Sequence, residues 1–115
     1  MTTPAPQVLD ASGSVTLDAS GHGVVQLAPE SFRTWLVTTI NVATSQDPTQ
    51  TPVPQVRVFL GGVGGQRVAQ SWMGNQSTAT GSTLVQPSQP LVIEWVIGVP
   101  GSVATAWLYG TMTMR

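Results

Sequence analysis

Pro54-Gln-Val-Arg-Val-Phe-Leu-Gly-Gly-Val-Gly-Gly-Gln-Arg-Val-Ala-Gln-Ser-Trp-Met-Gly-Asn75 is the stretch that decides the fold, because it predicts a β-hairpin. Strands are predicted from Gln55 to Leu60 and from Arg67 to Met73, where β-branched and apolar residues are frequent. The turn, Gly61 to Gly65, contains four glycines, which reach positive φ values that a side chain would resist. A Gly-Asn turn closes the second strand. The stretch holds no catalytic group, so it indicates an architecture rather than a chemistry.

Further strand patterns lie on both sides of this hairpin. Ser14 to Leu17 and Gly23 to Leu27 predict a first hairpin, with turn residues between them. Gln76 to Thr83 is Thr-rich and fits either a weak edge strand or a loop. The other predicted strands run over Thr34 to Ala43, Leu91 to Ile97 and Val103 to Met114.

About eight strands at a spacing of roughly 8 to 12 residues, with no helical window, predict an all-β fold. Proline-marked corners, such as Gln46 to Pro54 and Leu84 to Pro90, alternate with tight turns. This mixture favours an antiparallel β-sandwich of the jelly-roll or Greek-key type.

Period-two alternation predicts which side chains share a face of each strand. In Thr34 to Ala43, one face is expected to carry Leu36, Thr38, Ile40 and Val42, and the other Trp35, Val37, Thr39 and Asn41. The strand predicted from Leu91 to Ile97 is expected to carry on one face Leu91, Ile93, Trp95 and Ile97.

The last strand is apolar on both sides. One face is predicted to carry Val103, Trp107 and Tyr109, and the other Ala104, Ala106, Leu108, Met112 and Met114. Because the domain is small, we expect another subunit to cover one of these faces.

With 115 residues, the chain is long enough for one domain. Residues 1–9 contain two prolines and predict an extended N-terminal arm, and residues 10–115 predict a single β-sandwich domain. Charged residues make up 8%, lysine is absent and the net charge is -1, which disfavours nucleic acid as a partner. A nearly neutral surface favours a protein that works in an assembly, so we expect a homo-oligomer.

The chain contains no cysteine, which excludes disulfides, thiolate catalysis and Cys-based zinc sites. The N-terminus lacks the basic and apolar regions of a signal peptide, and no apolar run approaches the ~18 residues of a membrane helix. The sequence therefore predicts a soluble product made in the cytoplasm, without a membrane partner.

The titratable residues are too few and too scattered to predict a catalytic or metal site. His22 is the only histidine, so a multi-histidine metal site or a histidine-assisted triad has no second member. Asp10, Asp18 and Asp47 lie in turn-forming contexts. Glu94, one of two glutamates with Glu30, is expected to pair with an arginine such as Arg57 or to face solvent. We predict no catalytic, cofactor-binding or metal-binding residues, and no enzyme.

Four tryptophans are the remaining candidates for a binding site: Trp35, Trp72, Trp95 and Trp107. Aromatic side chains on a sandwich can stack on sugars, although within a strand pattern they more often fill the core or a subunit interface. A carbohydrate-binding surface therefore stays open as an alternative.

Several segments together resemble small β-sandwich virion proteins of tailed phages that infect actinobacteria. They are the Arg-Val-Phe-Leu-Gly-Gly hairpin, the Ser-Trp-Met-Gly-Asn turn, the Pro-Leu-Val-Ile-Glu-Trp strand and the Ala-Trp-Leu-Tyr-Gly-Thr ending. The resemblance covers about Ser14 to Thr111 and implies a jelly-roll protein of the virion that decorates or cements the capsid. It implies a trimer bound to the major capsid protein, or a related tail component. No functional residue follows from it.

The expected function is therefore that of a structural virion protein of a tailed bacteriophage, most simply a capsid decoration or cement protein that stabilises the head. The alternative is a phage tail or receptor- or carbohydrate-binding module.

Overall fold

The structure, a computed structural model, describes residues 7–47, 49, 51–61, 66–73 and 76–114, without the side chains of 66–73, 76, 77, 79 and 114. Eight strands form from these residues, and none of them is helical. No helix that could span a membrane occurs among them. The strands are β1 (Gln7–Thr16), β2 (Gly23–Leu27), β3 (Arg33–Thr44), β4 (Gln55–Leu60), β5 (Gln66–Met73), β6 (Gln76–Val85), β7 (Leu91–Val96) and β8 (Val103–Met114).

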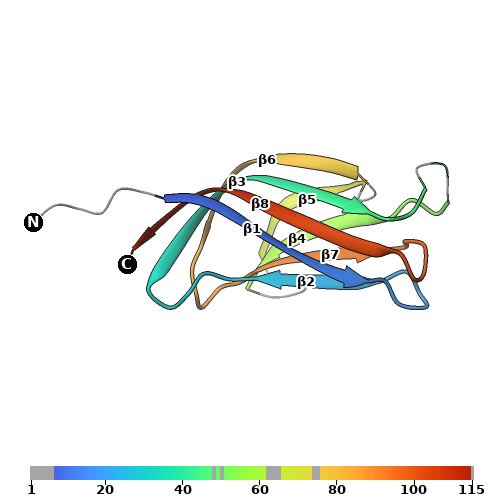
Figure 1. Ribbon diagram of the computed structural model, residues 1–115, viewed down its shortest axis with the longest axis horizontal. Helices are drawn as coiled ribbons and strands as arrows, with labels where there is room; N and C mark the ends of the chain where they lie inside the picture. Colours follow the sequence, from blue (N-terminus) through green and yellow to red (C-terminus); the bar gives the residue numbers. More distant parts are fainter. Residues whose placement is uncertain (1–6, 48, 50, 62–65, 74–75, 115) are drawn as a thin grey trace, which may run out of the picture.

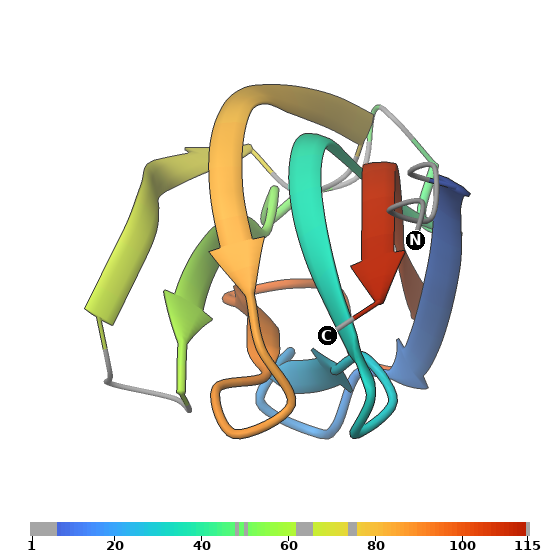
Figure 2. The same cartoon turned by 90° about the vertical axis from the view of Figure 1, so that its left-hand side faces the viewer.

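The strands form two four-stranded sheets in which every pair is antiparallel (Figures 1 and 2). One sheet has the order β1-β8-β3-β6 and the other the order β2-β7-β4-β5. Consecutive strands mostly lie in different sheets, and only β4-β5 pair as neighbours in sequence. This is the order of a jelly roll, so the predicted all-β sandwich of that type is confirmed.

The hairpin around which the sequence is organised is confirmed as β4 and β5, which pair from Gln55↔Met73 to Leu60↔Gln66 with two shifts of register. Gly61 has a φ of 94°, as expected where the glycine turn begins. The rest of that turn (62–65) and the Gly-Asn turn (74–75) lie outside the described residues.

The predicted first hairpin is wrong. β1 pairs with β8 and β2 pairs with β7, so the turn between β1 and β2 crosses from one sheet to the other. That turn lies against the β7–β8 connection, since the Leu17 N–H donates to the Ser102 carbonyl at 2.8 Å and the Gly98 N–H donates to the Gly21 carbonyl at 2.9 Å. β1 and β2 therefore pair with strands that are distant in the sequence rather than with each other.

The predicted N-terminal arm, residues 1–9, is wrong for its last three residues. Gln7, Val8 and Leu9 belong to β1, opposite Met112 to Gly110 of β8, and Leu9 is only 2% exposed. These residues were predicted to lie in the arm, with the first strand beginning at Ser14, but pairing with β8 holds them in the sheet. Residues 1–6 lie outside the described residues.

The core lies between the two sheets and is built by alternate residues of the strands. Trp95, near the end of β7, is fully buried, with Gly23 of β2 and Val56 of β4 as its register partners. Ala104, Ala106 and Leu108 of the last strand share one face, as predicted, and this face is the buried one, with all three at 0% exposure. The other fully buried aliphatic residues are Val56, Val58, Val85, Leu91 and Ile93.

A β-bulge at Thr38 overturns the predicted faces of β3. The register with β8 shifts between Val37↔Gly110 and Thr39↔Tyr109, so Thr38 has no partner of its own. One extra residue reverses the alternation. Buried side chains are consequently Trp35 and Val37 before the bulge and Ile40 and Val42 after it, whereas Leu36 is 40% exposed.

Ile97 was predicted to share a strand face with Leu91, Ile93 and Trp95, but it lies beyond the end of β7. Its φ is 62° and its side chain is 56% exposed. The left-handed conformation is costly for a β-branched residue, so the turn into β8 carries local strain at this position.

We expect Ile97→Asn to stabilise the protein by about 1 kcal/mol, because asparagine tolerates the left-handed region better and little apolar burial is lost. Urea unfolding measures the change. Val103→Asn, which removes a 42% exposed aliphatic side chain from regular strand backbone, is the matched control and should not stabilise. Equal stability of Ile97→Asn and wild type would contradict the strain.

Candidate interaction surface

The outer face of the β1-β8-β3-β6 sheet carries exposed side chains that are aligned across its four strands. Register places residues of the four strands in rows across this face. The first row runs Val8, Thr111, Leu36 and Leu84, from one edge strand to the other.

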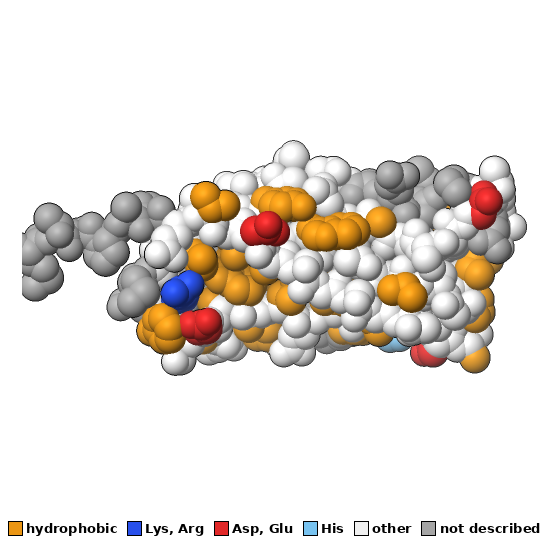
Figure 3. Space-filling view, viewed as in Figure 1, with side chains coloured by type: hydrophobic (Ala, Val, Ile, Leu, Met, Phe, Trp, Pro, Cys, Tyr) orange, Lys and Arg blue, Asp and Glu red, His pale blue; other side chains and the backbone are white. Residues whose placement is uncertain are grey.

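Val8, Leu36 and Leu84 form what we call the apolar row. Val8 is 79% exposed, Leu84 53% and Leu36 40%. Leu36 reaches this face only because of the bulge at Thr38. Figure 3 looks onto the sheet and shows hydrophobic side chains over β1 and β8 among a mostly uncharged polar surface. Large exposed apolar side chains aligned on one face are typical of a contact surface.

The next two rows carry the aromatic residues of β8. Tyr109 lies between Asp10 of β1 and Thr39 of β3, and it is 36% exposed. Trp107 follows two positions away, flanked by Ser12 and Asn41, and is half-buried. These three rows place two aromatic rings on one strand beside hydroxyl, amide and carboxylate groups.

Asn41 in the Trp107 row is itself held in place, because the Thr78 hydroxyl donates to its Oδ1 at 2.6 Å. Thr78 belongs to the edge strand β6, which confirms the strand alternative for Gln76 to Thr83.

The four tryptophans divide between the core and this surface. Trp95 is 0% exposed and Trp35 8%, so both are core residues. Trp107 stands on the outer face of the sheet, as the alternation of β8 predicted. The side chain of Trp72 lies outside the described part of the structure.

His22 was interpreted as an exposed turn residue, but it binds Glu94. Its Nε2 lies 2.8 Å from Oε2 of Glu94, whose side chain is only 10% exposed. The expected pairing of Glu94 with Arg57 is replaced by this contact, although Arg57 is the register partner of Glu94 on β4. Arg57 Nε is buried and has no hydrogen-bond partner. The two partners are 72 residues apart, and no sequence pattern connects them.

Asp18 shapes the turn that carries His22. Its Oδ1 accepts hydrogen bonds from the Ser20 hydroxyl at 2.7 Å and from the N–H groups of Ser20 and His22. These bonds, the hydroxyl's first, lower the pKa of Asp18 below its usual 3.8. A lowered pKa means that the carboxylate stabilises the turn above pH 3.8, and that this contribution disappears as the pH falls through the lowered value. Asp18 is thus a turn-former, as predicted.

Asp47 also acts as a turn-former, because its Oδ1 accepts bonds from the N–H and the hydroxyl of Thr49. The backbone bond first, then the hydroxyl, lowers the pKa of Asp47. Glu30 lies at the β2–β3 corner, 64% exposed, beside Arg33. Among the described residues, no group of three or more His, Asp or Glu side chains is placed to hold a metal ion.

Comparison with known proteins supports the fold alone. No protein-family model and no curated protein matches the sequence. Among solved structures, the crystal structure of a protein named FlhE aligns with a TM-score of 0.50 and 14% sequence identity. The alignment covers 92% of this chain and 97% of that chain.

Proposed function

We propose that this chain is a structural virion protein of a tailed bacteriophage, a decoration or cement protein that binds the major capsid protein and stabilises the head. The single observation that carries the proposal is the apolar row of Val8, Leu36 and Leu84 on the outer face of the sheet. Its residues expose apolar surface that a protein partner would remove from water.

The composition also supports a protein that works in an assembly. With 8% charged residues and a net charge of -1, neighbouring copies repel one another little. A jelly roll also suits dense packing in a shell, since its two sheets leave their outer faces for contacts. The trimeric state is proposed on the resemblance to small virion proteins described above.

The test measures binding to capsids that lack decoration protein. We expect Leu36→Ser with Leu84→Ser to weaken binding at least about tenfold, because central apolar contacts dominate such interfaces. The matched control, Ile97→Ser with Val103→Ser, changes two exposed aliphatic residues that lie outside the apolar row, and should bind like wild type. Sedimentation is expected to show a trimer. A stable monomer that fails to bind capsids or tails would sink the proposal.

Carbohydrate binding is the second candidate, and the pairing of Trp107 and Tyr109 with Asp10, Ser12 and Asn41 favours it. Aromatic rings stack on sugar faces while amide and carboxylate groups bind hydroxyls. Trp107→Ala and the double variant of Leu36 and Leu84 together separate the two functions. Sugar binding would be lost in Trp107→Ala and kept in the Leu36 and Leu84 double variant, whereas capsid binding would respond to the double variant.

A further inference from the structure

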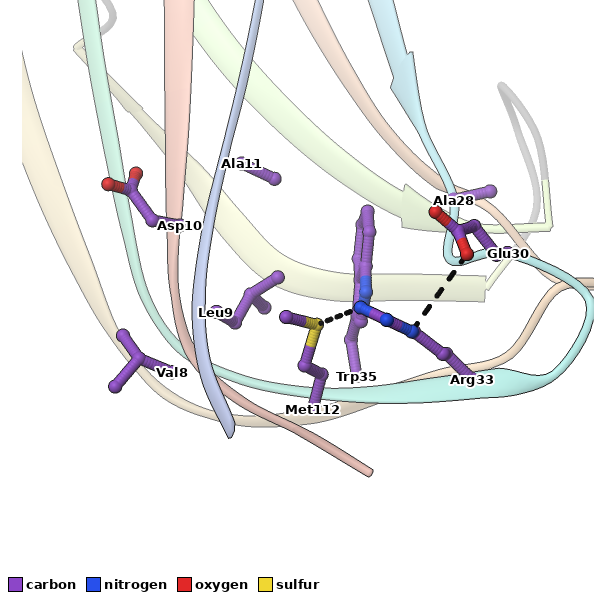
Figure 4. Close-up of a pocket in the computed structure, with 9 residues that line it drawn as sticks. All are labelled: Val8, Leu9, Asp10, Ala11, Ala28, Glu30, Arg33, Trp35 and Met112. Carbon is purple, nitrogen blue, oxygen red and sulfur yellow. Dashed lines mark hydrogen bonds and ion pairs between the residues drawn. The ribbon is translucent and has the colours of Figure 1, made fainter. Parts of the chain in front are cut away.

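A cavity of about 290 Å³ lies between β1 and the corner that joins β2 to β3. Figure 4 shows Leu9 and Ala11 of β1 turned to the same side as Trp35 and Met112, whereas Val8 and Asp10 are turned away. The space is therefore mainly apolar. Its lining residues are Val8, Leu9, Asp10, Ala11, Ala28, Glu30, Arg33, Trp35 and Met112.

Arg33 is the cation that lines this cavity, and its guanidinium N–H donors lack strong hydrogen-bond acceptors. Its Nε is buried without a hydrogen-bond partner, since Oε2 of Glu30 is 3.9 Å away. Its Nη1 donates to the thioether sulfur of Met112 at 3.3 Å, and a thioether is a weak acceptor. A guanidinium has five N–H donors in a planar fork that fits a carboxylate.

Glu30 does not saturate this guanidinium. Its side chain is 64% exposed, so it can turn into solvent, and its contact with Arg33 is longer than a hydrogen bond. The Phe32 ring, 5.3 Å from Cζ of Arg33, covers another side of the fork without accepting a conventional hydrogen bond. An incoming oxygen would therefore gain donors that are now unsatisfied.

The cavity adjoins an edge strand. β1 pairs with β8, and no described strand pairs with its other edge. An extended polypeptide can add to such an edge through main-chain hydrogen bonds. Alternate side chains of the added strand would face the same side as Leu9 and Ala11, which is the side of the cavity.

We propose that this cavity binds the C-terminal residue of an extended polypeptide, which adds to the free edge of β1. The apolar side chain of that residue fills the space beside Trp35, and its carboxylate binds the guanidinium of Arg33. The edge strand selects a polypeptide over a small free acid. The site shares only Val8 with the apolar row, and Leu36 and Leu84, the residues changed in the capsid-binding test, do not line it.

The test uses a fluorescein-labelled peptide, Thr-Val-Thr-Val-Leu, with a free C-terminal carboxylate or a C-terminal amide. Fluorescence anisotropy is expected to show at least about tenfold tighter binding of the acid, since the carboxylate supplies a charge-assisted pair. In Arg33→Gln the two peptides should bind equally. Ala28→Leu narrows the cavity and should weaken both, while Ala19→Leu, in an exposed turn, should weaken neither.

A folded Arg33→Gln protein that still prefers the acid would overturn the proposal, as would equal binding of acid and amide by wild type or binding of neither. If Arg33→Gln does not fold, Glu30→Gln replaces it, because its exposed side chain is not needed for folding. Removing the competing carboxylate should tighten acid binding about two- to threefold and leave amide binding unchanged. No change for either peptide would contradict the role of Arg33. The peptide test is independent of the capsid test, because the variant with Leu36→Ser and Leu84→Ser is expected to bind both peptides like wild type whether or not it binds capsids.

Discussion

Gly110→Ala is expected to destabilise the protein by about 3 kcal/mol or more, because the methyl group meets backbone that cannot move aside. A Cβ on Gly110 would overlap the carbonyl oxygen of Leu36 and lie 3.1 Å from the Thr38 nitrogen. The bulge at Thr38 brings this backbone over β8, and the Thr38 hydroxyl donates to the Tyr109 carbonyl at 3.3 Å. The glycine is therefore required by the bulge, which also turns Leu36 to the surface.

Urea unfolding followed by circular dichroism measures this loss. Gly101→Ala is the control, since Gly101 has a φ of 83° but nothing lies within 4 Å of an added Cβ. Its cost should be limited to backbone strain of about 1 kcal/mol. If Gly110→Ala costs no more than Gly101→Ala, the close approach of β3 and β8 is contradicted.

Trp95→Ala should cost about 3 to 5 kcal/mol, because it removes the largest fully buried side chain of the core. Trp95 lies near the end of β7, between its register partners Gly23 and Val56. A typical domain has a free energy of unfolding of about 5 to 15 kcal/mol, so the expected loss ranges from about a fifth of that free energy to all of it.

Thermal and urea unfolding of Trp95→Ala and Trp107→Ala compare the losses in free energy of unfolding. Trp107 is half-buried on the outer face of the sheet, and its loss should cost about 1 kcal/mol. Trp107→Ala therefore remains folded and usable in binding experiments. Equal losses for the two variants would show that Trp107 also belongs to the folding core.

Several features follow from local sequence alone. The alternation of β8 predicted both of its faces, because a pleated strand turns successive side chains to opposite sides wherever pairing is regular. The β4–β5 hairpin was also predictable, since its strands are joined by a short glycine-rich turn. For the candidate surface, the sequence placed Trp107 and Tyr109 on one side of the last strand.

Other features depend on pairing between distant strands. β1 and β2 were expected to close locally, yet they pair with β8 and β7, because two sheets bury more apolar surface than one hairpin. The contact of His22 with Glu94 follows from that arrangement, since the β1–β2 turn then lies beside β7. No local signal predicts either contact.

The sequence by itself determined that this chain folds as a small, nearly neutral, all-β sandwich, because strand periodicity, glycine and proline turns and composition are local properties. Only the tertiary structure decided which side chains reach its surfaces. A single unpaired residue, Thr38, reverses the faces of β3 and turns Leu36 outward to complete the apolar row. The edge position of β1 likewise opens the cavity beside Arg33, because an edge strand is covered on one side only.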